Sequence, residues 1–431
     1  MPDKNMQTNN GNFFERMRSL IGYYNFYSRM VELLFLKYLV TFADQLDLKD
    51  IQSYKAVSEF KRKYDEARNG VYVINRGDIT DLLISLDYLK GESNVSLSII
   101  ADHLSFFYDT ETQMQVLDMM DSLVMKNDRV YFIEVFDYLL CSSFNDVSKT
   151  GGYITGKALR SICMKLLNVK NSETYLDCYA GYSSSLIESK EINKYTGYEL
   201  NIDASVVSLI TSIMLGIKDY RIINGDFLSE ETDETADKVL SDVIFGYKRD
   251  LNHLASKYCV NTKDLDVLSF YKTFFAAKEK GSVVITVPGK FLFSTAKAYV
   301  ELREKITKNG LRAVISLPAL WQGLSMGTNL IYIDKTYTEE IEFVDASKLV
   351  FSEKRSSFTN LGNVGNVVDS IKELWSDDGF CNFVSREEVL KQGTWLPERY
   401  VKHEPVNSYR KVEEIDKELD SLYAQLQQNM K

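Results

Sequence analysis

Apolar residues recur at helical spacing through the first third of the chain, across residues 13–144. The repeat is clearest in two stretches, at residues 30–38 and 119–140. Steps of three and four residues place the apolar side chains on one face of a helix, which can then pack against other helices. Residues 1–148 are therefore predicted to form an all-helical N-terminal domain.

From residue 149 the pattern changes to short runs rich in β-branched and aromatic residues, separated by segments of helix length. The runs that predict strands are 174–176, 195–198, 221–223, 239–245, 282–287 and 312–317. Strands that alternate with helices indicate a mostly parallel sheet covered by helices, so an α/β, Rossmann-like domain is predicted over 149–350. Two further runs, 330–334 and 341–344, follow without long helices between them, which predicts an antiparallel edge.

Residues 351–431 are mixed and polar and are interpreted as a C-terminal extension that closes with a helix. That helix carries an apolar stripe at heptad spacing: Val412, Ile415, Leu419, Leu422 and Leu426. Two heptads are too short for a self-sufficient coiled coil, so the stripe is predicted to pack on another surface. Docking within the chain and docking on a partner subunit both stay open at this point.

The composition narrows the classes of function. The 431 residues are 45% hydrophobic and 26% charged, and their net charge of −10 does not favour contact with a phosphate backbone over the whole surface. Contact with nucleic acid would therefore need a local basic patch. Five scattered cysteines without CxxC spacing and three distant histidines disfavour zinc sites and disulfide frameworks.

The sequence also predicts a cytoplasmic protein without a membrane anchor. Its first residues, MPDKNMQTNNGNFF, are polar where a signal peptide needs an apolar core. The most apolar stretch, residues 33–40, is interrupted by Lys37, so it is not expected to span a membrane. Cysteines without a pairing pattern fit a reducing compartment.

Acidic residues follow three strands in the region where an open parallel sheet binds its ligands. Asp177 opens a loop that contains Gly181, Glu199 ends the second strand, and Asp226 and Phe227 follow the third. Carboxylates there can accept hydrogen bonds from ribose hydroxyls or an adenine amine, and an aromatic ring can stack on the base. Each acid taken singly also fits a surface residue or a helix cap. The three together predict an adenosine-containing ligand.

Several segments carry a resemblance to one known family. Residues 151–155 are similar to a stretch that leads into a cofactor site with a Tyr-Thr-Pro signature, with Gly156 in place of the proline. Residues 177–186 resemble Asp-Pro-x-Cys-Gly-Thr-Gly-Gly-Phe-Leu, and 197–201 and 225–228 match Gly-x-Glu-x-Asn and Gly-Asp-x-Leu. These patterns resemble the modification (M) subunit family of type I restriction-modification systems, which are adenine-specific DNA methyltransferases. The resemblance implies a class I methyltransferase domain behind a helical N-terminal domain.

The resemblance also implies S-adenosylmethionine as cofactor. The residues that would line its site are Tyr153, Thr155, Asp177, Gly181, Glu199, Asp226 and Phe227. The loop departs from the family pattern at Tyr182 and Ser183, where the family has Thr and Gly. These larger side chains are expected to add bulk beside the methionine part of the cofactor, so its binding is predicted to be weak or lost.

The family's catalytic motif, Asn/Asp-Pro-Pro-Phe/Tyr after the fourth strand, is absent. No two prolines of the chain are adjacent. With the fourth strand extending to residue 245, the motif position falls on Tyr247, Lys248, Arg249 and Asp250. In the family, this motif supplies hydrogen-bond acceptors for the target amine and a ring that stacks on the flipped base. Two cations there would oppose the positive charge that develops on the amine, so catalysis is predicted to be lost.

The leading hypothesis is a degenerate M-subunit-like protein, a non-catalytic structural or DNA-clamping component of a DNA-modification or phage-defence complex. Lys248 and Arg249 would then contact the DNA backbone, or simply form a solvated loop. An active adenine methyltransferase with a divergent loop is the first alternative, and a small-molecule methyltransferase is the second. A serine or cysteine hydrolase is disfavoured because no histidine lies near a candidate nucleophile in the sequence. The resemblance implies double-stranded DNA and a specificity subunit, or a second M-like chain held through the C-terminal helix, as partners.

Overall fold

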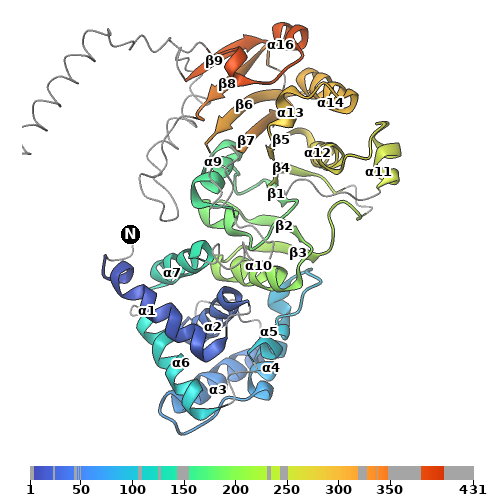
Figure 1. Cartoon of the computed structure of the whole chain (residues 1–431). Coiled ribbons are helices and arrows are strands. Elements are labelled where there is room, and N and C mark those ends of the chain that lie inside the picture. The colour runs from blue at the N-terminus through green and yellow to red at the C-terminus, as the bar shows by residue number, and fades with distance from the viewer. Residues whose placement is uncertain are drawn as a thin grey trace, which may run out of the picture.

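The computed structural model describes residues 4–22, 25–42, 46, 48, 50–104, 109–124, 128–142, 155–230, 234–242, 251–318, 328–336, 338–347 and 380–401. Helices of the N-terminal third lie at one end of the molecule, and an α/β part built on one large sheet forms the rest (Figure 1). No helix in these ranges has the length and apolar character needed to cross a bilayer. The predicted C-terminal helix at 412–426 lies outside them.

The N-terminal third is helical, as its apolar spacing predicts. Its elements are α1 (Lys4–Ile21), α2 (Phe26–Thr41), α3 (Ile51–Arg68), α4 (Arg76–Ser85), the 3-10 turn η2 (Asp87–Lys90), α5 (Ile99–His103), α6 (Thr110–Leu123) and α7 (Arg129–Ser142). Nearly every residue of α2 is buried, because α1, α3, α6 and α7 surround it. A helix that is apolar on most sides is stable only in such an interior position, which accounts for the apolar stretch at 33–40.

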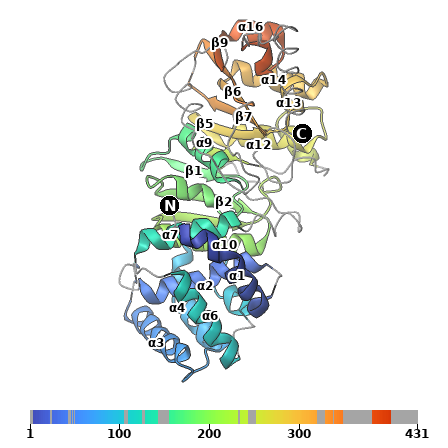
Figure 2. The ribbon, with the colours of Figure 1, turned by 60° about the vertical axis from the view of Figure 1, so that its left-hand side comes forward.

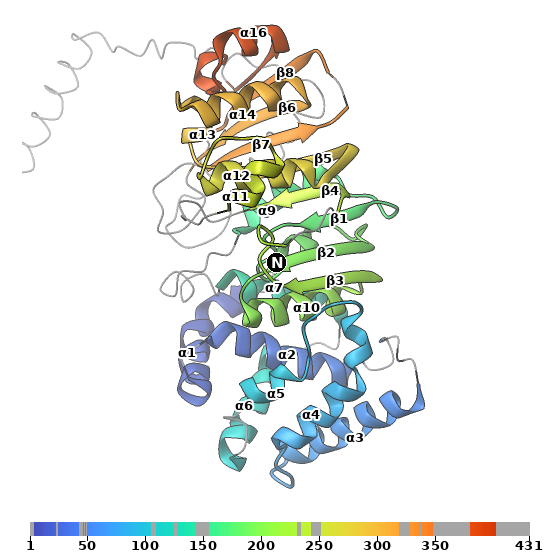
Figure 3. The ribbon, with the colours of Figure 1, turned by 90° about the vertical axis from the view of Figure 1, so that its right-hand side faces the viewer.

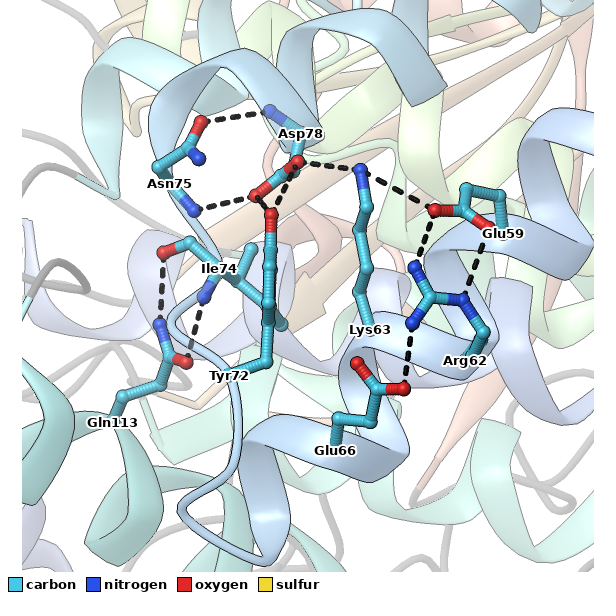
Figure 4. Close-up of polar contacts among 9 residues, drawn as sticks. All are labelled: Glu59, Arg62, Lys63, Glu66, Tyr72, Ile74, Asn75, Asp78 and Gln113. Atoms are coloured by element: carbon cyan, nitrogen blue, oxygen red, sulfur yellow. Dashed lines mark hydrogen bonds and ion pairs between the residues drawn. The ribbon is translucent and has the colours of Figure 1, made fainter.

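Polar contacts join α3, α4 and α6 (Figure 4). Asn75 and Asp78 form a capping box at the start of α4, with backbone N–H groups donating to both side chains. The Asp78 carboxylate also accepts a hydrogen bond from Lys63 of α3 at 2.7 Å. Gln113 of α6 exchanges two hydrogen bonds with the backbone of Ile74, each 2.9 Å long. These contacts satisfy the polar groups that the helix ends would otherwise leave unpaired.

The described strands form one sheet in the order β3-β2-β1-β4-β5-β7-β6-β8-β9. Their bounds are β1 (Thr174–Asp177), β2 (Lys194–Glu199), β3 (Asp219–Asn224), β4 (Ala236–Ser241), β5 (Ala277–Val287), β6 (Leu311–Leu317), β7 (Thr328–Asp334), β8 (Glu340–Asp345) and β9 (Cys381–Ser385). The strands from β3 to β5 in this order pair in parallel, and β6 pairs in parallel with β8. The mostly parallel sheet confirms the predicted α/β class.

The antiparallel strand β7 lies inside the sheet, between β5 and β6, and not at the edge that the sequence predicts. Leu330, Ile331 and Ile333 are fully buried in it. Such an apolar strand needs cover on both faces, which a central position supplies. The far edge is formed by β9, which pairs antiparallel with β8 and comes from the segment interpreted as a C-terminal extension.

Helices cover both faces of the sheet. Figure 3 shows the strands side by side in their sheet order, from β3 next to the N-terminal helices to β8. One face packs against α9 (Lys157–Leu167), the 3-10 turn η4 (Ser184–Glu188) and α10 (Ile202–Leu215). The other packs against α12 (Leu265–Phe275), α14 (Lys297–Lys308) and α16 (Arg386–Gln392), with the short elements α11 (Asn252–Lys257), α13 (Lys290–Phe293) and η6 (Pro397–Arg399) nearby. Alternate residues such as Tyr175 and Leu176 enter the two different cores, as the pleat requires.

Candidate functional site

The carboxyl ends of β1 to β4 meet at one edge of the sheet. Asp177 ends β1, Glu199 ends β2, Asp226 follows β3 by two residues, and Asp242 directly follows β4. In the parallel register, Asp177 is level with Gly197, two residues before the end of β2. The topology thus brings together the three acids predicted from the sequence and adds Asp242, which that reasoning missed. These four acids define what we call the acidic edge.

Asp177 is 3% exposed and accepts hydrogen bonds only from uncharged groups among those that the structure describes. The donors are the backbone N–H of Tyr179 at 3.3 Å, the Tyr175 hydroxyl at 3.3 Å and the Ser185 hydroxyl at 3.2 Å. Burial raises the pKa of Asp177 to about 7 against these hydrogen bonds, and the negative charge of Asp242 adds to the rise. A carboxyl in this setting would be stabilised by a cationic group placed beside it.

The glycine loop after β1 is held by Glu199. Gly181 has a positive φ of 53°, and a Cβ built on it would meet nothing within 4 Å, so the backbone here borders open space. Its N–H donates to Glu199 Oε2 at 3.0 Å, while Glu199 Oε1 accepts from the Asn201 N–H at 2.6 Å. Burial raises the pKa of Glu199. Each carboxylate oxygen has a further lone pair, so Glu199 can both hold the loop and accept from a ligand hydroxyl.

The two side chains expected to crowd this loop point into packed protein. The Tyr182 hydroxyl lies 3.0 Å from Ser28 Oγ of α2, within hydrogen-bond distance. Ser183 is buried with a positive φ of 52°, and its Oγ lies 2.6 Å from the Tyr195 hydroxyl and also contacts Ser208. Weak cofactor binding was predicted from bulk at these two positions beside the methionine part. The structure does not show that bulk, because both side chains face packed protein.

Asp226 and Phe227 serve the protein's own structure. Asp226 accepts from the Leu228 N–H at 3.0 Å and from the Ser229 hydroxyl at 2.7 Å, as a cap of the following turn does. The Phe227 ring is 3% exposed. It packs edge-on against Tyr179 and Tyr198, and Lys272 Nζ lies 4.7 Å from its centroid. In this arrangement the ring has no free face for a base to stack on.

Asp242 connects three segments at the end of β4. Thr155 donates to its Oδ2, and Thr286 of β5 donates to its Oδ1 at 2.8 Å. Burial raises the pKa of Asp242. The sequence did contain a signal for this residue, because Asp242 is the first acid that interrupts the apolar run 239–245.

The apolar run predicts that the fourth strand extends to residue 245. The strand β4 ends earlier, at Ser241. The predicted motif residues Tyr247, Lys248, Arg249 and Asp250 lie outside the described ranges, and so does Tyr153. A second feature that the sequence reasoning missed is Leu200, whose side chain is 71% exposed next to Glu199. Within the described ranges, no three His, Cys, Asp or Glu side chains form a group that could hold a metal ion.

Several solved structures share the fold of this chain. The chain is similar in structure to a type I restriction-modification methyltransferase subunit from Streptococcus thermophilus, with a TM-score of 0.74 and 17% identity over 93% of this chain and 99% of that one. A protein assigned as the modification subunit of a type I restriction enzyme from Vibrio vulnificus YJ016 gives 0.64 and 15%, over 92% and 96%. A chain from work on the assembly of the type I restriction-modification system gives 0.67 and 16%, over 100% and 98%. No functionally curated protein sequence matches significantly.

Identities this low establish the fold, and they confirm the predicted class I methyltransferase fold with added helices. The family described as N-6 DNA methylase matches residues 127–408, which is well over half of the chain and includes the whole acidic edge. The chain therefore belongs to the N-6 DNA methylase family.

Proposed function

We propose that this chain is an M-subunit-like component of a DNA-modification or phage-defence complex that binds a nucleoside cofactor but does not methylate DNA by the route usual for its family. The observation that carries the proposal is the surroundings of Asp242, the acid directly after β4. The hydroxyl groups of Thr155 and Thr286 already use one lone pair on each of its carboxylate oxygens, so only the remaining lone pairs could accept from a target amine. The chain also has no pair of adjacent prolines to hold the second acceptor, a backbone carbonyl, in a fixed position.

The end of β4 supports a second reading of the family motif. If the motif begins directly after the strand, it reads Asp242-Val243-Ile244-Phe245, with the acid and the ring kept and both prolines replaced. The reading that places it at Tyr247 to Asp250 lacks the acceptor, the prolines and the ring. Both readings lack the prolines whose rigid rings hold the accepting backbone carbonyl in place, and a misplacement of about 1 Å can cost about a hundredfold in rate.

The acidic edge fits S-adenosylmethionine, which supplies a transferable methyl group when it is bound. Its ammonium and sulfonium groups are cations, and Asp177 is a buried acid that has no basic partner among the described residues. Glu199 is placed to accept from ribose hydroxyls, and the exposed Leu200 offers an apolar surface to the adenine ring. We expect measurable binding, because Tyr182 and Ser183 are directed away from this edge.

An active adenine methyltransferase is the second candidate, and the position of Asp242 favours it. A carboxylate directly after β4 could accept a hydrogen bond from the target amine through a remaining lone pair, while Thr155 and Thr286 keep their contacts. Phe245 would then supply the stacking ring. This candidate differs from the first in one measurable quantity, the transfer of methyl groups to DNA.

The test is incorporation of labelled methyl groups into duplex DNA, with and without a specificity-type subunit. We expect no incorporation above background for the wild type. Turnover that disappears in Asp242→Ala but persists in Asp219→Ala, an exposed acid on β3, would establish the second candidate. Turnover that depends on Tyr247 instead, tested with Tyr247→Phe, would place the acceptor at the position predicted from the sequence.

The partner proposal concerns the C-terminal helix, which we expect to bind a specificity-type subunit or a second M-like chain. Removing residues 413–431 should leave the unfolding temperature unchanged, because they follow η6, the last described element, in the sequence. It should weaken association with the partner, measured by size-exclusion chromatography of the mixture. Identical profiles for the full-length and truncated chains would mean that the apolar stripe packs within the chain.

A further inference from the structure

Residues of the N-terminal region contact three segments that adjoin the acidic edge. One contact reaches β3, a second reaches the first turn of α10, and a third reaches the glycine loop. Figure 2 shows α10 between the N-terminal helices and the sheet. We call these three contacts the domain interface.

The first contact extends the sheet beyond its edge strand β3. The Ile222 N–H donates to Ser93 Oγ at 2.8 Å, and the Asn94 N–H donates to the Ile222 carbonyl at 3.2 Å. The Asn224 N–H donates to Asn94 Oδ1 at 2.7 Å, while its side-chain amide donates to the Glu199 carbonyl at 3.1 Å. The edge groups of β3 are thus paired with the helical domain, and Asn224 passes that restraint to the end of β2.

The second contact is an ion cluster centred on His103 of α5. His103 Nδ1 lies 2.6 Å from Glu32 Oε1 of α2, and its Nε2 lies 3.1 Å from Asp203 Oδ1 of α10. Asn25 donates to the other Asp203 oxygen, and Arg29 pairs with Glu32 at 3.1 Å. Burial opposes protonation, but hydrogen bonds to Asp203 and Glu32 raise the pKa of His103 to about 9. The ring is therefore cationic at neutral pH and joins acids of two domains.

The third contact holds the glycine loop itself. The Tyr182 hydroxyl meets Ser28 of α2 at 3.0 Å, and the Tyr182 carbonyl accepts from Thr211 Oγ1 of α10 at 2.8 Å. Gly181, the preceding residue, is held from the other side by Glu199. The loop backbone therefore lies between a contact to the helical domain and a contact to an acid of the acidic edge.

We propose that the helical domain sets the shape of the acidic edge, with Tyr182 as the positioning residue of the glycine loop and His103 as that of the α10 turn. The proposal rests on the proposed function, because it assigns the purpose of this arrangement to cofactor binding. The simpler alternative is that these contacts only hold the two domains together. The two differ in whether loosening the interface changes the glycine loop or only the contacting helices.

Two mild variants, Tyr182→Phe and Ser28→Ala, remove one hydrogen bond without opening the core. The measurement is hydrogen–deuterium exchange with mass spectrometry, read on residues 178–186 and on the contacting segments 26–32 and 202–208. Each variant should raise exchange in 178–186 by about 3- to 10-fold, the value of one hydrogen bond, and the double variant should raise it no further. Tyr54→Phe, at a half-exposed tyrosine of α3, is the matched control and should change nothing.

Faster exchange confined to 26–32 and 202–208 would overturn the proposal, because the interface would then only hold the two domains together. Unchanged exchange throughout would overturn it as well. A second arm titrates the same variants with S-adenosylmethionine by calorimetry, and Kd should rise about 3- to 10-fold in both. If the wild type shows no binding, the cofactor part of the proposed function fails, while the exchange result still decides whether the helical domain shapes the loop.

Discussion

The two halves of the sheet contain buried charges of different kinds. Arg303, under the half formed by β5 to β9, is 4% exposed and donates to three backbone carbonyls, those of Phe291, Ser294 and Gly393. Asp177 and Asp242, at the end of β1 to β4, receive hydrogen bonds from neutral groups, and burial raises the pKa of each. A buried arginine that donates to backbone carbonyls holds segments of the fold together, whereas a buried acid with only neutral partners among the described residues marks a candidate site.

The largest expected loss of stability is in the half of the sheet formed by β5 to β9. Arg303→Met would leave three carbonyls without their donor, so we expect a loss of roughly 3–5 kcal/mol in the free energy of unfolding, measured by urea denaturation. The control is Arg62→Met, since Arg62 forms surface pairs with Glu59 and Glu66 of α3 (Figure 4) and should contribute little. A small loss in Arg303→Met would break the comparison, because the buried arginine would then not be structural.

The second prediction concerns Asp177 of the acidic edge. Here the substitution is expected to raise the free energy of unfolding and not to lower it. The folded-state pKa of Asp177, about 7, lies above its usual value, so the associated stability is present below about pH 4 and is lost as the pH rises through 7. Asp177→Asn removes this loss. The variant should therefore be more stable than the wild type at pH 8, with an advantage that grows by about 2–3 kcal/mol between pH 5 and 8, and it should bind S-adenosylmethionine poorly.

Asp237→Asn sharpens this prediction as a matched acid. Despite partial burial, hydrogen bonds from Lys278 and Thr174 lower the pKa of Asp237 to about 2. Its contribution is therefore present above its usual pKa and is lost as the pH falls towards 2, so its replacement should destabilise the protein at neutral pH. Urea denaturation at pH 8 measures the change in the free energy of unfolding for each variant. If both variants change it in the same direction, the distinction between a structural acid and a site acid is contradicted.

The smallest effect is expected at the domain interface. The folded-state pKa of His103, about 9, exceeds its usual value, so its stabilisation is present below about pH 6.5 and is lost as the pH rises through 9. The wild type should lose roughly 2 kcal/mol between pH 7 and 9.5, and His103→Gln should lack most of this dependence. Thermal unfolding across this range, with the exposed His253→Gln as control, measures it. An unchanged slope in His103→Gln would show that other groups govern the interface.

The strands β1, β2 and β3 lie within two residues of their predicted positions, because alternation and β-branched composition are properties of neighbouring residues. The end of β4 was predicted too late, since the apolar run continues at 243–245 beyond Ser241. Hydrophobicity alone cannot mark such an end. The position of β7 was wrong for a different reason: local pattern identifies a strand but does not say which neighbours it pairs with.

The residues of the candidate site could also be predicted only in part. Asp177, Glu199 and Asp226 could be predicted because polar residues that follow strands of a parallel sheet share one edge. The direction of the Tyr182 side chain could not, because bulk in a loop predicts crowding only if the side chain faces the ligand. Phe227 was expected to be open to a base, and the rings of Tyr179 and Tyr198 pack against it.

The sequence by itself determined the helical first third, the α/β alternation, the acids at the strand ends and the absence of adjacent prolines, since each depends on residues close together in the chain. Only the tertiary structure decided that Asp242 meets Thr155, that His103 joins Glu32 to Asp203, and that Tyr182 meets Ser28, 154 positions away. Such partners are selected by the packing of distant segments, and residues within one element carry no record of which distant surface they will face.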